Sequence, residues 1–234
     1  MTKNMTEGHP LKLIMMFALP LLLGNLFQQT YNIVDTAIVG QTLGANALAA
    51  VGATSSVQFL VLGFCIGISC GFGIPIAQAF GGNNLKRMRD YIYHSIILTI
   101  IIGVILTVGC CLLCMTIIHI LQIPTEIASR SYMYLLIIFI GLPCTLLYNL
   151  CSSILRSVGD SRTPFMFLAF SACLNIILDL FCIIILKLDV AGAALATIVS
   201  QGISGILCLI YMKKRFTVLH LEKENKVIKS PMVK

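Results

Sequence analysis

Six long apolar stretches, separated by short polar connections, set the pattern of this chain, and they cover residues 11–39, 48–80, 91–121, 131–155, 164–186 and 190–212. Each one exceeds the roughly 20 residues that an α-helix needs to cross a hydrocarbon core about 30 Å thick. A soluble domain carries about 25% charged residues. This chain carries 11%, with 58% apolar residues and a mean hydropathy of +0.97. The pattern therefore predicts an all-α fold, a polytopic membrane bundle of six transmembrane helices.

The segments outside the spans are short. Residues 1–10 precede the first span, and residues 213–234 follow the last one as a polar, mostly basic tail. The first apolar stretch is too long for a signal peptide and has no small-residue cleavage site, so we expect it to remain as a span. The predicted organisation is one transmembrane unit, residues 11–212, with a short polar segment at each end.

The placement of positive charge predicts the orientation of the bundle. If the N-terminus is cytoplasmic, 14 of the 16 Lys and Arg residues fall on the cytoplasmic side, and only Arg130 and Lys187 fall outside. Cytoplasmic segments of membrane proteins carry such an excess. We expect a multi-pass protein of the cytoplasmic membrane with both termini cytoplasmic and with anionic lipid headgroups as neighbours. The net charge of +7 is thus a topology signal, and no nucleic-acid partner is expected.

The cysteines and histidines indicate neither a metal centre nor catalysis. Most of the ten cysteines lie inside spans, and no pair has zinc-ligand spacing in a loop. Free Cys behaves in such surroundings as a small apolar residue. The sequence has no HExxH motif and no convincing nucleophile–base pairing. We expect neither an enzyme nor a bound cofactor.

Two carboxylates, Asp35 and Asp179, lie inside the apolar stretches. A charged side chain in a span is costly and normally faces a bundle interior or a water-filled cavity, so it marks an ion or substrate path. Asp179 follows Asn175 by four residues, which puts both on one helix face. At about 1.5 Å per residue, Asp35, Asp179 and Thr197 lie about 6 to 10 Å below the outer ends of three spans. The amides that precede Asp35 on its helix are Asn25, Gln28, Gln29 and Asn32.

Polar groups that share one layer can hold a coupling ion. Removal from water favours the neutral, protonated form of a carboxyl group, and carboxylate, amide and hydroxyl oxygens also suit a small hard cation. Either ion changes the charge beside a helix, which is what a coupled transporter needs. The alternative is that Asp35 and Asp179 are structural, each hydrogen-bonded to a neighbouring helix.

Three spans contain a proline, namely Pro20, Pro75 and Pro143. Each one removes a backbone hydrogen bond and can bend its helix. Pro20 precedes the amides and Asp35 on the same helix, so a bend there would move them relative to the other spans. The alternative is a fixed kink that only shapes the packing.

Six stretches follow one another along the chain: the Pro20 helix that ends in YNIVDTAIVG, then LGANALAAVG, AQAFGG, LRSVGDSRTP, LNIILDLF and GAALATIVSQ. In these stretches, and up to about Arg215, the chain resembles the N-terminal half of the MATE (multidrug and toxic compound extrusion) family. The resemblance implies one lobe of a twelve-span fold, in which two six-helix lobes face a central cavity and alternate between outward- and inward-open forms. It also implies antiport: export of drugs or toxic amphipathic and cationic compounds in exchange for H⁺ or Na⁺.

The resemblance also implies roles for single residues. Asp35 looks like the first-helix acid that is central to ion coupling, with H⁺ or Na⁺ as the coupling ion. Asn175, Asp179 and Thr197 match the positions that join it in the cation site. Pro20 matches a first-helix proline whose bending is linked to protonation. The cavity-lining residues would be Asn25, Gln28, Asn32 and Asn149.

The partners expected from the resemblance are small-molecule drug or toxin substrates, the lipid bilayer and a second six-helix lobe. Residues 213–234 resemble the start of the connection to that lobe. A lone lobe would expose Asp35 and Asp179 to lipid, which is costly, so a non-transporting membrane fragment or an assembly partner is one alternative. A lipid-linked oligosaccharide flippase of the same superfamily is another. It is disfavoured because such cavities tend to need cationic residues, and no Lys or Arg lies in the core of a span.

Overall fold

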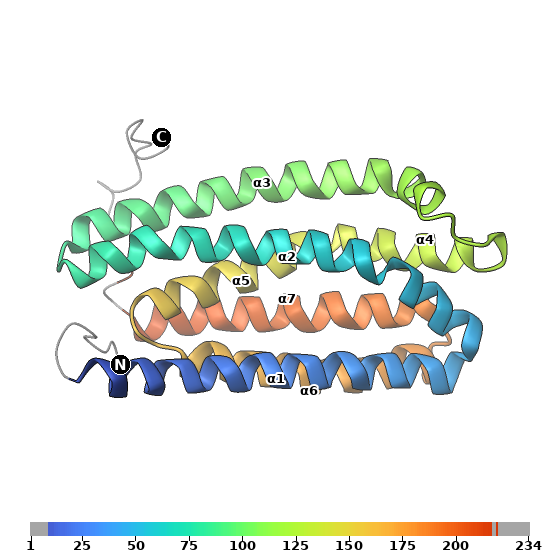
Figure 1. The fold of residues 1–234 in the computed structure, drawn as a ribbon, viewed down its shortest axis with the longest axis horizontal. Coiled ribbons are helices and arrows are strands. Elements are labelled where there is room, and N and C mark those ends of the chain that lie inside the picture. The colour runs from blue at the N-terminus through green and yellow to red at the C-terminus, as the bar shows by residue number, and fades with distance from the viewer. Residues whose placement is uncertain (1–8, 217–218, 220–234) are drawn as a thin grey trace.

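A computed structural model describes residues 9–216 and 219, and every regular element in this part of the chain is helical (Figure 1). The predicted all-α class is confirmed. The predicted N-terminal segment 1–10 and most of the predicted tail 213–234 lie outside the described residues. The elements are α1 (Pro10–Leu43), α2 (Ala45–Gly81), α3 (Leu85–Ile120), α4 (Thr125–Ile140), α5 (Leu142–Ser157), α6 (Arg162–Leu180), η1 (Phe181–Ile185) and α7 (Asp189–Arg215).

Up to six of these units are long and apolar enough to cross a membrane. Five are single spans: α1, α2, α3, α6 together with η1, and α7. The sixth consists of α4 and α5, which are bent by 45° where they meet. The chain is therefore a multi-pass membrane protein, as the apolar pattern predicted.

The bend between α4 and α5 lies at a glycine and a proline two residues apart, Gly141 and Pro143. Pro143 lies in the first turn of α5, where its fixed φ and missing N–H are tolerated. A Cβ atom on Gly141 would collide with the side chain of Ile198 on α7, so glycine permits the close approach of α7 to the bend. The predicted span 131–155 thus consists of two helices, with the bend beside Pro143, one of the three prolines at which the sequence predicted that a helix can bend. By contrast, α1 and α2 continue as single helices through Pro20 and Pro75.

A single π-helical turn, η1, ends α6 two residues after Asp179. Its widened backbone pairs the Leu186 N–H with the Phe181 carbonyl at 3.0 Å, a five-residue step. The start of α7 packs directly on this turn, because a Cβ atom on Gly192 would lie 3.1 Å from Cys182 Cβ. The return from α6 to α7 is therefore tight, and it brings the two helices side by side.

Three groups of buried apolar side chains hold the helices together. One group, around Leu155, joins α2, α3, α5 and α7. A second, around Val39, joins α1, α2, α4, η1 and α7. A third, around Phe139, joins α2, α3, α4 and α5. All three groups include α2 and two of them include α7, so these two helices tie the others into one bundle.

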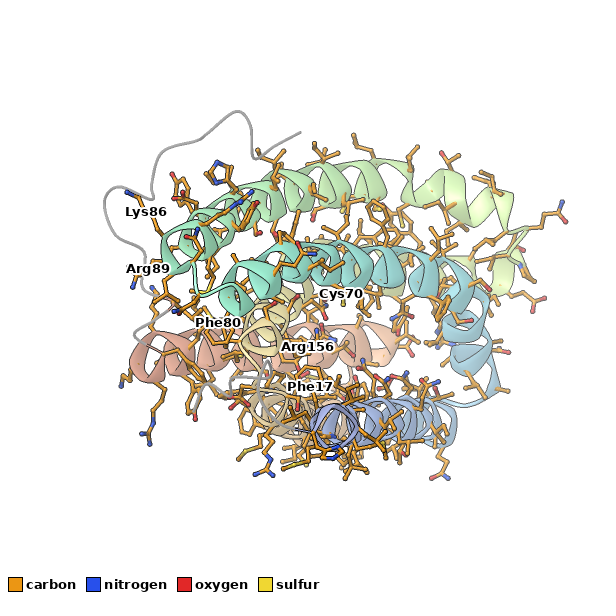
Figure 2. The ribbon with its side chains drawn as sticks, turned by 60° about the vertical axis from the view of Figure 1, so that its left-hand side comes forward. Phe17, Cys70, Phe80, Lys86, Arg89 and Arg156 are labelled. Atoms are coloured by element: carbon orange, nitrogen blue, oxygen red, sulfur yellow. The ribbon has the colours of Figure 1, made fainter. Side chains whose placement is uncertain are left out.

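Positive side chains gather at one end of the bundle. The start of α3 and the ends of α5 and α7 lie at the left of Figure 1, and Figure 2 brings this end forward with Lys86, Arg89 and Arg156 labelled. At the opposite end, Arg130 Nε donates to Asp189 Oδ2 at 2.7 Å and so joins α4 to α7. The charge separation read from the sequence is thus a separation in space.

The first helix is the least enclosed element. It lies along α6 at one edge of the bundle (Figure 1), and among its described residues only Gly24 and Val39 are buried. Large apolar side chains such as Leu22, Leu26 and Ile33 are exposed on it. An apolar surface of this kind is suited to contact with lipid or with another protein surface.

Candidate functional site

The structure brings together four polar residues that the sequence singled out on three helices. Asp35 comes from α1, Asn175 and Asp179 from α6, and Thr197 from α7. Asn175 Nδ2 donates to Thr197 Oγ1 at 3.2 Å, and Thr197 Oγ1 donates to the Ala193 carbonyl at 3.0 Å. The carboxyl groups of Asp35 and Asp179 lie within hydrogen-bonding reach of each other. We call these four residues the carboxylate site.

The carboxylate site is closed on its α6 side and contains no cationic side chain. Asp179 is 0% exposed and Asn175 is 1% exposed, whereas Asp35 and Thr197 are half-buried. Within the described part of the chain, no Lys or Arg acts on either carboxyl group. Two adjacent buried carboxylates repel each other and lose hydration. The site therefore favours a state in which at least one carboxyl group is neutralised.

Four oxygen atoms of the carboxylate site accept no hydrogen bond from the described residues: Asp35 Oδ1, both carboxyl oxygens of Asp179, and Asn175 Oδ1. Two ionised carboxylates cannot bond to each other, because neither carries a hydrogen; one proton shared between them supplies the donor. Carboxylate, amide and hydroxyl oxygens also form a ligand set that hard cations prefer. The same residues thus fit a proton or a small cation, although the described residues hold no cluster of three or more His, Cys, Asp or Glu that suits a metal ion.

Two tyrosines that the sequence analysis missed border the carboxylate site. Tyr31 lies one turn before Asp35 on α1, and its hydroxyl lies near that of Thr197. Tyr134 of α4 interacts electrostatically with both carboxyl groups, and its hydroxyl contacts Gln58 of α2. The four-residue spacing from Tyr31 to Asp35 was a signal available in the sequence. The position of Tyr134 depends on how α4 packs, which no local pattern reveals.

A crevice of about 60 Å³, in which polar groups lie among apolar side chains such as Leu62 and Leu168, adjoins the carboxylate site, and Tyr31 borders both. Gln28 and Asn149 line it, as do Thr145 and Gln201. Thr145 Oγ1 donates to Gln201 Oε1 at 2.7 Å, and Asn149 Nδ2 donates to the Thr145 carbonyl at 2.9 Å. A water molecule occupies about 30 Å³ of liquid. The crevice can therefore hold about two waters or one small polar group, and no drug-sized molecule.

The other residues predicted on α1 have more open surroundings. Asn25 and Asn32 are exposed, and Asn32 Nδ2 donates to Gln29 Oε1 at 3.2 Å. Asn32 and Gln29 both line a broad, open groove beside α2. Pro20 is half-buried near the other end of α1. The polar residues of α1 thus divide between the carboxylate site with its crevice and the exposed face of the helix.

Comparison with known proteins identifies relatives of the chain. A family model described as MatE matches residues 20–181. The probable multidrug resistance protein YpnP of Bacillus subtilis (strain 168) is 33% identical over 211 residues, which is 90% of this chain and 47% of that protein. The probable multidrug resistance protein NorM of Thermotoga maritima is 33% identical over 208 residues, 87% of this chain and 45% of that protein.

Solved structures agree with this relationship. A MOP superfamily transporter from Pyrococcus furiosus has a TM-score of 0.91 at 26% sequence identity, covering 99% of this chain and 52% of that chain. That protein is described as having a binding pocket of reverse polarity that suggests a different function. The chain spans about half the length of the relatives it matches.

Proposed function

The chain belongs to the MatE family, and from this membership we propose that it is the ion-coupling half of an exporter of drugs or toxic amphipathic and cationic compounds. Export is driven by the opposite movement of H⁺ or Na⁺. The two relatives described as multidrug resistance proteins are about twice as long as this chain. A second six-helix half is therefore the partner that the proposal requires. We assign both termini to the cytoplasmic side of the cytoplasmic membrane, because membrane proteins concentrate Lys and Arg there.

The observation that carries the proposal is the pair of facing carboxyl groups, Asp35 and Asp179. They come from different helices, and three of their oxygen atoms have no donor among the described residues. A purely structural pair would have its oxygens satisfied by neighbouring donors, because an unpaired buried acceptor costs about 1–3 kcal/mol. A pair that binds and releases a positive ion has to leave those oxygens available. The proton and Na⁺ remain equal candidates, because the same oxygens suit both.

Loading the carboxylate site changes the force between α1 and α6. Two unit charges about 4 Å apart repel by about 4 kcal/mol at an effective dielectric constant of 20. A free-energy difference of 1.4 kcal/mol changes an equilibrium constant about tenfold. Binding of one positive charge can therefore change the equilibrium constant between two positions of a helix by several hundred-fold. Asp179 is fixed within the bundle, whereas Asp35 lies on the sparsely buried α1. We therefore assign the response to α1, with a bend at Pro20, where a backbone hydrogen bond is missing.

The substrate contacts a wider surface than the crevice beside the carboxylate site. The crevice, at about 60 Å³, is too small for a drug, whereas pockets for such ligands have volumes of about 300–1,000 Å³. Gln28 and Asn149 can supply hydrogen bonds at its edge, and the exposed Asn25 and Asn32 extend the polar contacts along α1. Apolar side chains between these polar residues can bind ligands of varied structure through non-directional apolar contact. The remaining wall is assigned to the second half.

The test replaces Asp35 with asparagine, which keeps the shape of the side chain and removes its charge. The Asp35→Asn chain is expressed in a pump-deficient bacterium together with the C-terminal half of the Bacillus subtilis relative, and ethidium efflux is measured under separate H⁺ and Na⁺ gradients. Asp160→Asn is the matched control: Asp160 lies between α5 and α6 and caps α6 through the N–H groups of Arg162 and Thr163. Its replacement removes one charge outside the carboxylate site.

We expect efflux from the wild type and from Asp160→Asn, driven by one of the two gradients, and none from Asp35→Asn at equal membrane insertion. Efflux from Asp35→Asn at the wild-type rate would exclude the coupling role of Asp35. If the wild type, inserted and paired, transports nothing under either gradient, the chain is a non-transporting partner and the proposal fails as a whole.

A further inference from the structure

Two buried thiols face each other across the interface between α5 and α7. The helices run in parallel, and small residues of α7 bring the backbones together. A Cβ atom on Gly202 would lie 3.2 Å from Cys144 Sγ, and one on Gly205 would lie 3.2 Å from the Tyr148 backbone nitrogen. Between these two contacts the register advances by four residues on α5 and by three residues on α7. The next step along this ladder pairs Cys151 with Cys208.

Cys151 and Cys208 make the contact that the ladder predicts. Their thiols interact with each other, and the two residues are only 2% and 0% exposed. They belong to the same buried apolar group, which also includes Leu155 and Met212. Cys151 lies six residues before the end of α5 and Cys208 seven before the end of α7, about 9–10 Å from those ends at 1.5 Å per residue. The proposed transport mechanism uses neither thiol.

We propose that Cys151 and Cys208 form a binding site for a soft cation that takes two thiolates in a linear arrangement, such as Hg(II) or Cu(I). Thiolate is a soft ligand that selects such ions, and it binds them in the deprotonated form. With mercuric chloride, two S–H bonds break and two Hg–S bonds form, while two protons and two chloride ions leave; no oxidant or reductant is needed. The bound ion joins α5 covalently to α7, and α7 is the helix that also carries Thr197.

The other buried cysteines show why this pair is distinct. Cys182 is buried against the start of α7, and no other thiol acts on it among the described residues. Cys65 and Cys114 belong to a looser group between α2 and α3, whose other members, Cys110 and Cys111, are only half-buried. That group can also bind mercury. The experiment therefore has to identify the shared site by the number of ions that each variant loses, and not by total uptake.

The experiment compares the full chain with Cys151→Ser, Cys208→Ser and the double variant. Each protein, purified in detergent, is equilibrated with mercuric chloride and then with excess 2-mercaptoethanol, which removes ions held by a single thiol. Retained mercury per chain is measured by mass spectrometry. We expect each single variant to retain one ion fewer than the wild type, and the double variant to retain the same number as the single variants. Mercury should also raise the melting temperature of the wild type more than that of any of these variants.

Cys182→Ser is the matched control for removing one buried thiol, and it should retain as much mercury as the wild type. Losses that add in the double variant would mean two independent thiols and would overturn the shared site. Retention equal to the wild type in all three variants would overturn it as well. If the serine variants are not monodisperse or helical, the same comparison is made with alanine, which the apolar surroundings accept more readily.

Discussion

Replacing Asp179 with asparagine tests the repulsion between the two carboxyl groups of the carboxylate site. In the wild type, both carboxyl oxygens of Asp179 lack a donor and face Asp35. An asparagine at this position has nearly the same shape, carries no charge and has an Nδ2 group that can donate to Asp35. The substitution should therefore abolish ion coupling and at the same time stabilise the fold at high pH.

The size and sign of the effect follow from the pair. A proton shared in the folded state is released on unfolding above about pH 4, so the free energy of unfolding of the wild type falls by about 1.4 kcal/mol per pH unit while the proton is held. Once it is lost, repulsion of about 4 kcal/mol acts between the two charges. In Asp179→Asn a hydrogen bond to the charged Asp35 contributes about 1.5–3 kcal/mol instead, and no shared proton is involved.

The assay is thermal unfolding in detergent, followed by circular dichroism between pH 5 and pH 9. We expect the two proteins to melt close together at pH 5 and Asp179→Asn to melt at a clearly higher temperature at pH 9. The control Asp160→Asn should follow the pH dependence of the wild type, because its cap on α6 lies outside the carboxylate site. A melting temperature of Asp179→Asn below that of the wild type throughout would refute the reasoning, since it would mean that Asp179 receives stabilising hydrogen bonds.

Two further substitutions test the frame around the site. Gly141→Ala should destabilise the chain by about 1–3 kcal/mol, because the added methyl collides with Ile198; adding Ile198→Ala should recover part of the loss in melting temperature, and a loss unaffected by the second change would exclude this contact as the cause. Pro20→Ala replaces a residue about 3 kcal/mol less favourable than alanine in a helix interior. It should stiffen α1, raise the melting temperature and slow efflux in the paired transporter, whereas efflux at the wild-type rate would remove Pro20 from the mechanism.

Much of the fold was predictable because the membrane makes length and hydropathy decisive. Each of the six apolar stretches lies inside a helical unit, except that the stretches 91–121 and 164–186 extend one residue past the end of theirs. The bend at Gly141 was only partly accessible: Pro143 indicated a weak point, whereas the collision at Gly141 involves Ile198, far away in sequence. The π-turn η1 was not predicted, because a run of Phe, Cys and Ile has no feature that distinguishes it from an ordinary apolar helix.

The charged residues of the candidate site could be predicted from the sequence, whereas the residues around them were predicted only in part. Asp35 and Asp179 stand out because ionisable side chains are rare inside spans, and helical depth placed Thr197 in the same layer. Tyr134 could not be found in the same way, because tyrosine is common in membrane helices and only the packing of α4 brings it to the carboxyl groups. The roles assigned to the amides of α1 stay predictions until transport is measured.

The π-turn after Asp179 also bears on how the sequence can change over evolutionary time. Such a turn is an α-helix that has accommodated one additional residue. Loss of a single codon within residues 181–185 would restore an ordinary helix and rotate the residues that follow the turn by about 100° relative to α6. Asn175 and Asp179 precede the turn and would keep their register with each other. A lineage that varies in length at this point therefore keeps both residues on one face of α6, whereas a one-residue deletion between Asn175 and Asp179 would separate them at once.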